Sequence, residues 1–163
     1  MAIASLYMRT RREAYAGFFP AEYLAAMSVE QYTSAWQERL SGGAPEMQTF
    51  VAENTRGDIA GFTRFGHHNG LQHSEGEVEF LYVAPEYWRQ GAGTMLMREA
   101  VATMTRAGLE SAVLWVYRDN DRARAFYERC GWRHDGAEQD RDFASALIRQ
   151  LRYRRRLKVD VPI

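Results

Sequence analysis

The stretch from residue 77 to residue 96 constrains this chain most. It consists of a largely apolar run ending at Val83, a Pro-containing turn, a loop with two glycines, and a segment of helical periodicity. The helical periodicity continues past residue 96, where apolar residues recur at three- and four-residue steps: Leu96, Met97, Ala100, Val101 and Met104. The order strand, glycine loop and helix predicts an anion site, because the first turn of a helix has free N–H groups and partial positive charge.

The glycine loop favours phosphate among anions. Gly91 and Gly93 let a bulky group approach the main chain, and Arg89 adds a charge nearby. A dinucleotide-binding fingerprint would need a third glycine where Leu96 stands, and the loop lacks the Gly-Lys-Ser/Thr of a P-loop. The plainer alternative is a glycine turn before an ordinary helix, and the loop alone does not decide between the two.

Length and composition exclude several classes of protein. A chain of 163 residues with 46% hydrophobic residues can form one good core, so a single domain over residues 1–163 is expected. Basic and acidic residues both number 21, which argues against a nucleic-acid-binding protein. No apolar run reaches membrane-spanning length, and arginines follow the apolar N-terminus, which argues against a membrane protein and a signal peptide. The single Cys130 permits no internal disulfide, which suits a cytoplasmic location.

The remaining periodicities predict helices that flank a mixed sheet. Two helices are expected early in the chain and a third near its end, over residues 3–16, 28–40 and 120–130. Five strands join the one that ends at Val83, over residues 49–53, 59–65, 111–117, 132–137 and 146–157. The first three strands read as an antiparallel meander. Residues 111–117 form an unbroken apolar run after a helix, which predicts a buried strand parallel to its neighbour.

Two polar segments have a plain interpretation. Residues 67–73 contain His67, His68 and His73, but adjacent histidines in a glycine-containing loop lack the spacing of metal ligands on regular elements. A solvated loop is expected there, and no metal site. The three arginines of residues 154–156 are expected at a solvated strand end.

Residues 77–96 together with residues 120–132 resemble the two main motifs of the GNAT superfamily of N-acetyltransferases, in the right order and at the right spacing. The resemblance extends over most of the chain. Within the superfamily the chain is similar to one large, loosely characterised bacterial branch. It implies a GNAT fold of the α+β (α/β) class. Such a fold has a central mixed, mostly antiparallel sheet that splays between its two central parallel strands, flanked by about four helices.

The resemblance also implies ligands and the residues that bind them. Acetyl-CoA would be the acyl donor and an amine of a small molecule or peptide the acceptor, with no metal. The pyrophosphate would lie on the backbone amides of the loop, which are those of Arg89, Gln90, Gly91, Ala92, Gly93 and Thr94. The pantetheine arm would pair with the backbone of Leu81, Tyr82 and Val83, as an added strand, and would touch Asn120.

Two residues match catalytic positions of the family. Tyr127 corresponds to the tyrosine that often protonates the departing thiolate, and Glu77 to a strand glutamate that in some members removes a proton from the amine, directly or through water. Each has a plainer alternative. Tyr127 lies on the apolar face of its helix, where packing alone would explain it. Strand alternation places Glu79 on the same face as Glu77, so Glu79 is a rival base, and either carboxylate could serve only to orient the substrate.

The chain departs from the family pattern in two places. Trp88 stands where many members have Gln or Arg. Members normally begin with a strand before the first helix, whereas this chain starts almost inside that helix, so either the true start lies upstream or one sheet edge is open. An open edge predicts a homodimer. Two other functions stay open: a protein that binds acyl-CoA without turnover, and an interaction module that recruits another chain.

Overall fold

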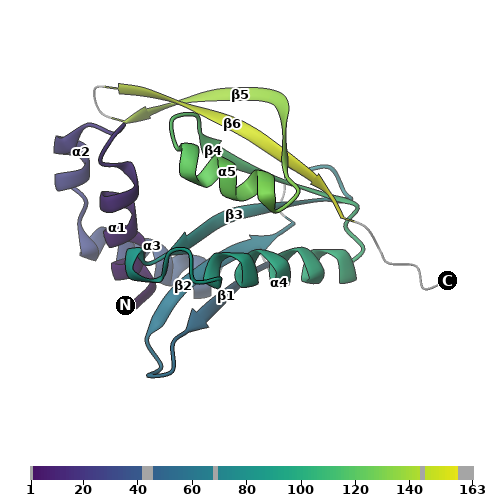
Figure 1. The fold of residues 1–163 in the computed structure, drawn as a ribbon, viewed down its shortest axis with the longest axis horizontal. Coiled ribbons are helices and arrows are strands. Elements are labelled where there is room, and N and C mark those ends of the chain that lie inside the picture. The colour runs from purple at the N-terminus through teal and green to yellow at the C-terminus, as the bar shows by residue number, and fades with distance from the viewer. Residues whose placement is uncertain (1, 42–45, 68–69, 144–145, 158–163) are drawn as a thin grey trace.

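The structure is a computed structural model that describes residues 2–41, 46–67, 70–143 and 146–157 of the chain. Its centre is a six-stranded sheet of order β1-β2-β3-β4-β6-β5 (Figure 1). The strands are β1 (Met47–Glu53), β2 (Ile59–Gly66), β3 (Glu75–Val83), β4 (Ser111–Tyr117), β5 (Arg133–Phe143) and β6 (Ala146–Arg156). All neighbours are antiparallel except β3 and β4. The predicted mixed, mostly antiparallel sheet is confirmed.

The helices are α1 (Ala2–Tyr15), α2 (Ala21–Ala25), α3 (Val29–Ser41), α4 (Ala92–Arg106) and α5 (Asp121–Arg129), with the 3-10 turn η1 (Pro85–Tyr87) before α4. Four of them match the predicted segments, and the five-residue α2 was not predicted. Strand β5 is longer than predicted, because it runs to Phe143 and not to Ala137. Its side chains are mostly exposed, so hydrophobic alternation gave no signal. Backbone pairing with β6 and ion pairs such as that between Arg149 and Asp140 extend it.

The two central strands separate along their length. Strands β3 and β4 pair only from Glu75 to Glu77 on β3. Beyond this point the two halves of the sheet diverge toward the side on which α1 and α2 lie (Figure 1). A β-bulge lies just past the last paired residue, because Arg64 of β2 pairs with Phe80 while the next residue pairs with Val78. Such a bulge bends and twists a strand, which helps to turn β3 away from β4.

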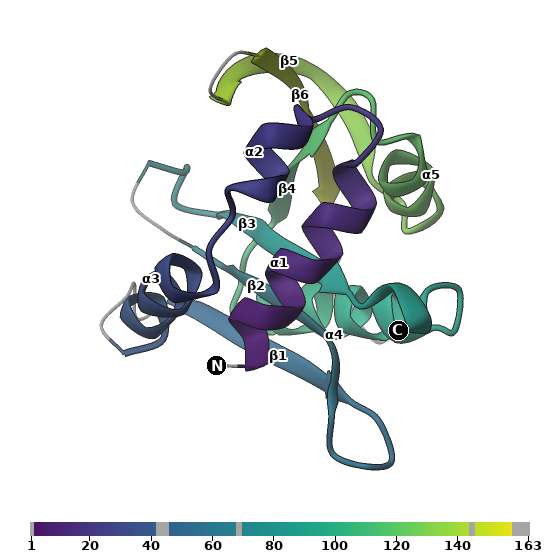
Figure 2. The ribbon, with the colours of Figure 1, turned by 90° about the vertical axis from the view of Figure 1, so that its left-hand side faces the viewer.

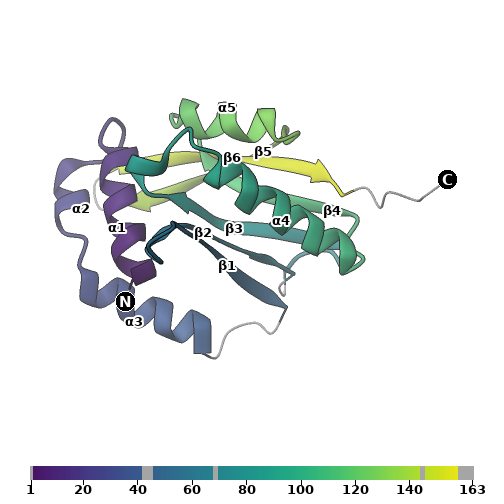
Figure 3. The same cartoon turned by 60° about the horizontal axis from the view of Figure 1, so that its bottom comes forward.

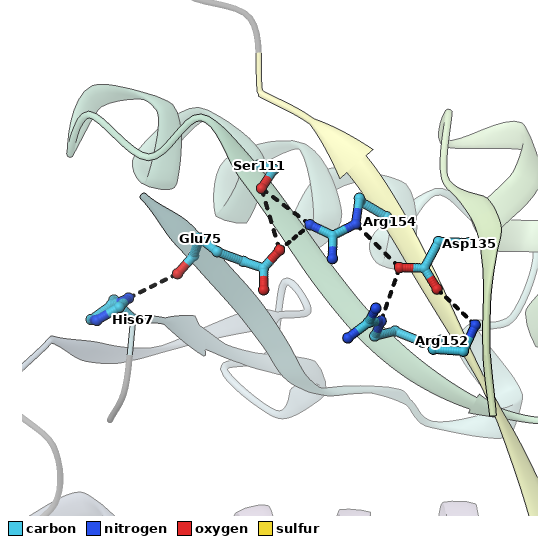
Figure 4. A network of polar contacts seen from close by, with 7 residues as sticks. His67, Glu75, Ser111, Asp135, Arg152 and Arg154 are labelled. Atoms are coloured by element: carbon cyan, nitrogen blue, oxygen red, sulfur yellow. Dashed lines mark hydrogen bonds and ion pairs between the residues drawn. The ribbon is translucent and has the colours of Figure 1, made fainter. Parts of the chain in front are cut away.

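An ion-pair network joins the strands at the opposite, closed end of the sheet (Figure 4). Glu75 is only 5% exposed, and its carboxylate contacts Arg154 of β6 and accepts a hydrogen bond from Ser111 of β4. Arg154 also contacts Asp135 of β5, with Nε 3.1 Å from Oδ2, and Arg152 donates to the same oxygen at 2.9 Å. The network therefore ties β3, β4, β6 and β5 together where β3 and β4 still pair.

Helices cover both faces of the sheet. Helices α4 and α5 lie on the opposite side of the sheet from α3 (Figure 3), and they form one core with Trp132 and the sheet residues beneath them. Helices α1 and α3 form a second core around Trp36 and Phe62. Helix α1 lies across the open end of the sheet (Figure 2). The open end is thus bounded by α1 on one side and by α4 and α5 on the other.

The histidine segment falls partly outside the described residues, since residues 68–69 are not among them. Within the described part, Nδ1 of His67 lies 2.8 Å from the carbonyl oxygen of Glu75. No group of three or more potential ligand side chains arranged for a metal occurs in residues 2–41, 46–67, 70–143 and 146–157. In the same ranges no helix is long and apolar enough to cross a membrane.

Candidate active site

A cavity of about 1020 Å³ occupies the open end of the sheet. Its walls are the diverging ends of β3 and β4, the loop before α4, the first turns of α5, and one face of α1. Residues 78–83 of β3 and residues 115–117 of β4 all line it. The cavity therefore connects the predicted anion site with the aromatic-rich helices at the start of the chain.

The N-terminus of α4 leaves its first amides free to bind a ligand. Gly91, the N-cap, has φ 90° and carries no side chain that could cap the helix. The first intrahelical bond runs from the N–H of Met95 to the carbonyl of Gly91, at 2.9 Å. The N–H groups of Ala92, Gly93 and Thr94 consequently have no acceptor within the helix. Gly91, Gly93 and Thr94 line the cavity, so this end of α4 fits a phosphate group.

Two arginines add positive charge beside this helix end. Arg89 lines the cavity with φ 61°, an uncommon backbone angle for a residue other than glycine. Arg122, at the start of α5, stacks on Trp88 with its guanidinium carbon 3.3 Å from the ring centroid. Burial, with Arg89 nearby, lowers the pKa of Arg122. Both cations complement the charge of a diphosphate. The side-chain amide of Gln90 donates to the carbonyl of Glu86 at 2.6 Å and so stabilises the loop.

Sequence reasoning missed the roles of Trp88 and Arg122. The indole N–H of Trp88 donates to the carbonyl of Val83 at 2.7 Å, which fixes the ring on which Arg122 stacks. Arg122 lies inside the motif of residues 120–132, so a signal was present in the sequence. The partner Trp88 was not recognisable, because the family more often has a polar residue there.

The predicted strand residues expose one backbone edge to the cavity. Leu81, Tyr82 and Val83 pair with β2 on one side and have no partner strand among the described residues on the other. An extended ligand could add there as a strand. The side chain of Tyr82 points toward α1, because its hydroxyl oxygen lies 2.9 Å from that of Tyr15.

Asn120 lines the cavity and also caps α5. Its Oδ1 accepts a hydrogen bond from the N–H of Ala123 at 3.1 Å. The cap fixes the side chain at the edge of the cavity, where the sequence predicted a ligand contact.

Tyr127 lines the cavity from α5. Its hydroxyl makes no hydrogen bond to any other described residue. Burial raises the pKa of Tyr127, with a smaller contribution from Cys130, so the phenol stays protonated at neutral pH. Tyr127 thus lines the cavity with a protonated hydroxyl that has no acceptor among the described residues.

The two glutamates of β3 occupy different positions. Glu77 lies in the closed part of the sheet, opposite Val113, and does not line the cavity. Glu79 does line it. Its carboxylate lies 3.0 Å from Nε of the buried Arg64 and 3.9 Å from Nε of Arg39. The structure therefore brings Glu79 and Tyr127 into one cavity, and Glu77 lies outside it.

Two further lining residues of α1 were not singled out by sequence reasoning. Arg11 is 6% exposed and Thr10 is 4% exposed. Arg11 donates from Nη1 to the hydroxyl of Tyr7, and its guanidinium carbon lies 5.2 Å from the ring centroids of both Tyr7 and Tyr15. The four-residue spacing of Tyr7, Arg11 and Tyr15 places them on one helix face, which was a usable signal.

Comparisons with known proteins agree with this geometry. The sequence model of the Acetyltransferase (GNAT) family matches residues 8–132. The uncharacterised N-acetyltransferase YuaI of Bacillus subtilis is 29% identical over 119 residues, which span 72% of this chain and 66% of the relative. A spermidine N(1)-acetyltransferase of Thermoplasma acidophilum is 28% identical over 120 residues, 73% of each chain.

The fold also has solved counterparts. The crystal structure of the PaiA N-acetyltransferase of Thermoplasma acidophilum, in complex with coenzyme A, superposes with a TM-score of 0.66 at 22% identity. The superposition covers 91% of this chain and 89% of that one. The family match covers most of the chain, and the sheet opens between β3 and β4 as the resemblance implied. The chain therefore belongs to the GNAT family of acetyltransferases.

Proposed function

We propose that this protein is an acetyl-CoA-dependent N-acetyltransferase that acetylates a primary amine by direct attack within a ternary complex. One observation carries the proposal: the uncapped N-terminus of α4, the free edge of β3 and the side chain of Tyr127 all line the same cavity. The GNAT match and the coenzyme A bound to a protein of the same fold support the choice of acyl donor.

The donor would bind along three parts of the cavity wall. The amides of residues 91–94, with Arg89 and Arg122, would hold the pyrophosphate by charge-assisted hydrogen bonds. The backbone of Leu81, Tyr82 and Val83 would pair with the pantetheine arm, and Asn120 would contact it from the start of α5. The thioester would then lie near Tyr127. The acceptor amine would approach from the side of α1.

The reaction needs an uncharged amine and a protonated leaving group. The amine nitrogen forms a bond to the thioester carbonyl carbon, and the carbon–sulfur bond breaks. Tyr127 gives its phenolic proton to the departing sulfur, so free coenzyme A leaves as a thiol. Tyr127 then recovers a proton from solvent. Holding both reactants in one cavity contributes much of the acceleration, and no step requires a metal.

A carboxylate of β3 would accept the proton of the amine, directly or through water. The sequence pointed to Glu77, with Glu79 as its rival. We favour Glu79, because it lines the cavity with Tyr127, whereas Glu77 lies in the closed part of the sheet. Arg64 and Arg39 hold the carboxylate of Glu79 in position, with their Nε atoms 3.0 Å and 3.9 Å from its oxygens.

Thermal unfolding with and without acetyl-CoA, followed by detection of free thiol with a panel of amines, tests the proposal. Saturating acetyl-CoA should raise the unfolding temperature, and thiol release should depend on an amine. A shift without amine-dependent release would favour a protein that senses acyl-CoA without turnover. The absence of any shift would contradict the proposal and favour an interaction module.

The edge strand β1 supports a homodimer as a second, independent proposal. Among the described strands β1 pairs only with β2, and Val51 on it is 42% exposed. Light scattering at micromolar concentrations should give twice the monomer mass, and Val51→Lys should reduce it to the monomer mass. A monomer in the unsubstituted protein would contradict the dimer.

A cytoplasmic location stays a prediction from the single Cys130.

A further inference from the structure

From the buried guanidinium of Arg11 we infer that the acceptor is a small primary amine that also carries a carboxylate. The inference rests on the proposed acetyl transfer and names the class of its substrate. Arg11 would bind the carboxylate at the α1 end of the cavity, while the amine of the same molecule faces the thioester.

Arg11 is a buried cation without a counter-ion. It is 6% exposed, and no carboxylate of the described residues lies within ion-pair distance of it. Nη1 donates to the hydroxyl of Tyr7, but Nε and Nη2 have no partner. Unpaired, buried charged groups carry a large desolvation cost, so their retention points to a ligand that supplies the missing acceptors.

A second unpartnered group lies next to Arg11. The hydroxyl of Thr10, which is 4% exposed, has no hydrogen-bond partner either. A helical threonine commonly donates to a backbone carbonyl one turn earlier, and Thr10 does not. Across the described residues four buried side-chain polar atoms lack partners, and three of these belong to Thr10 and Arg11. Both residues line the cavity.

Aromatic side chains surround Arg11 at this end of the cavity. The rings of Tyr7, Tyr15 and Phe19 lie within 5.8 Å of the guanidinium carbon. These rings exclude water, which strengthens an ion pair between Arg11 and a carboxylate. The forked donors of a guanidinium also match the geometry of a carboxylate.

The charge of the whole lining disfavours a polyamine acceptor. Of the charged side chains that line the cavity from described residues, Glu79 is the one carboxylate, and it is paired to Arg64. The others are arginines: Arg11, Arg89, Arg122 and Arg129. A polyamine is a polycation, so the positive charge of Arg11 would repel it. The relative of 28% identity named for spermidine therefore does not define the acceptor of this chain.

The test compares acceptors of nearly the same shape, one with a carboxylate and the other with a neutral carboxamide in its place. Each L-amino acid is assayed beside its carboxamide, with saturating acetyl-CoA and free-thiol detection, and spermidine is included. At least one amino acid should have kcat/KM roughly 10- to 100-fold above that of its carboxamide, as for loss of one hydrogen-bonded charge pair. In Arg11→Met this preference should disappear, mainly through a higher KM for the amino acid. Arg11→Lys should retain part of the preference.

Arg9→Met is the matched control on the same helix. Arg9 is solvent-exposed, lies outside the cavity lining and pairs with Glu86 at 2.8 Å. This variant should keep the full carboxylate preference. Unfolding temperatures with acetyl-CoA verify that each variant is folded and binds the donor.

Three results would overturn the inference. Equal turnover of every amino acid and its carboxamide would do so, as would a preference that survives in Arg11→Met, or spermidine as the best acceptor. In each of these cases acetyl transfer itself still stands. A lack of any thermal shift with acetyl-CoA, in contrast, would remove the proposed function and the inference with it.

Discussion

The hydroxyl of Tyr127 is the atom on which the proposed chemistry depends most directly. Tyr127→Phe removes the proton donor and changes little else, because the hydroxyl has no partner among the described residues. We expect kcat to fall by roughly 100-fold or more, the usual range for loss of a general acid, while the affinity for acetyl-CoA is unchanged. Steady-state kinetics and calorimetric titration measure the two quantities. Tyr32→Phe, outside the cavity lining, is the control and should keep full activity.

The carboxylates of β3 can be separated by paired substitutions. Glu79→Gln should lower kcat/KM by roughly 100-fold at neutral pH and less at high pH, where more of the amine is already deprotonated. The kcat/KM of Glu77→Gln should stay within about threefold of that of the unsubstituted protein. A larger loss of kcat/KM in Glu77→Gln than in Glu79→Gln would instead identify Glu77 as the base. Unfolding temperatures are needed beside the rates, since Glu79→Gln leaves the buried Arg64 without its closest ion pair.

Single residues also show where sequence reasoning succeeded and where it did not. Tyr127 and Asn120 were predicted from a motif of contiguous residues, and both line the cavity. Arg11 was not predicted, because an arginine on an arginine-rich helix is normally solvated. Its burial arises where α1 packs against residues distant in the chain, among them Tyr82 and Tyr117.

At the scale of elements, the start of α4 can be tested through its left-handed cap. Gly91 has φ 90°, and a Cβ in this conformation costs about 1–2 kcal/mol although nothing lies within 4 Å of it. Gly91→Ala should therefore weaken acetyl-CoA binding by roughly tenfold, since relief of the strain moves the first amides of the helix. Titration calorimetry gives the affinity.

Gly108 provides a matched control at the other end of the same helix. It has φ 82° and open space around it, so Gly108→Ala should lose comparable stability but keep the affinity for acetyl-CoA. An equal loss of affinity in both variants would show that helix stability, and not the geometry of the first turn, is what binding requires.

Among the elements, the apolar strands and amphipathic helices were predictable. Strand β4 has the predicted bounds, because its apolar run is largely buried, with Ala112, Leu114 and Val116 in the core beneath α4 and α5. The second half of β5 was not predictable, since its mostly exposed residues carry no hydrophobic period. The bulge at Glu79 was equally hidden, because it depends on the register with β2.

At the scale of the whole molecule, the buried tyrosines around the open end should make the protein less stable at alkaline pH. Burial raises the pKa of Tyr117 from 10.0 to about 12, and it also raises those of Tyr15 and Tyr82. A raised pKa means that the folded state favours the neutral phenol. This contribution is fully present below the unfolded value of 10.0 and is lost as pH rises toward about 12.

The free energy of unfolding should consequently fall above about pH 10, by up to about 1.4 kcal/mol per pH unit for each such tyrosine. Urea denaturation between pH 8 and pH 11 measures the slope. Tyr117→Phe removes one titrating group and should make the slope shallower. A slope unchanged by this substitution would mean that Tyr117 ionises in the folded protein as readily as in the unfolded chain.

The amino-acid sequence by itself determined the strand, glycine loop and helix of residues 77–96, and the second motif that carries Tyr127. Both depend on residues close together in the chain, whose spacing and backbone freedom act locally. Only the tertiary structure decided how far β3 and β4 pair, which glutamate of β3 reaches the cavity, and that Arg11 is buried without a counter-ion. These features arise from contacts between α1, β3, β4 and α5, and no local pattern encodes burial that distant segments create.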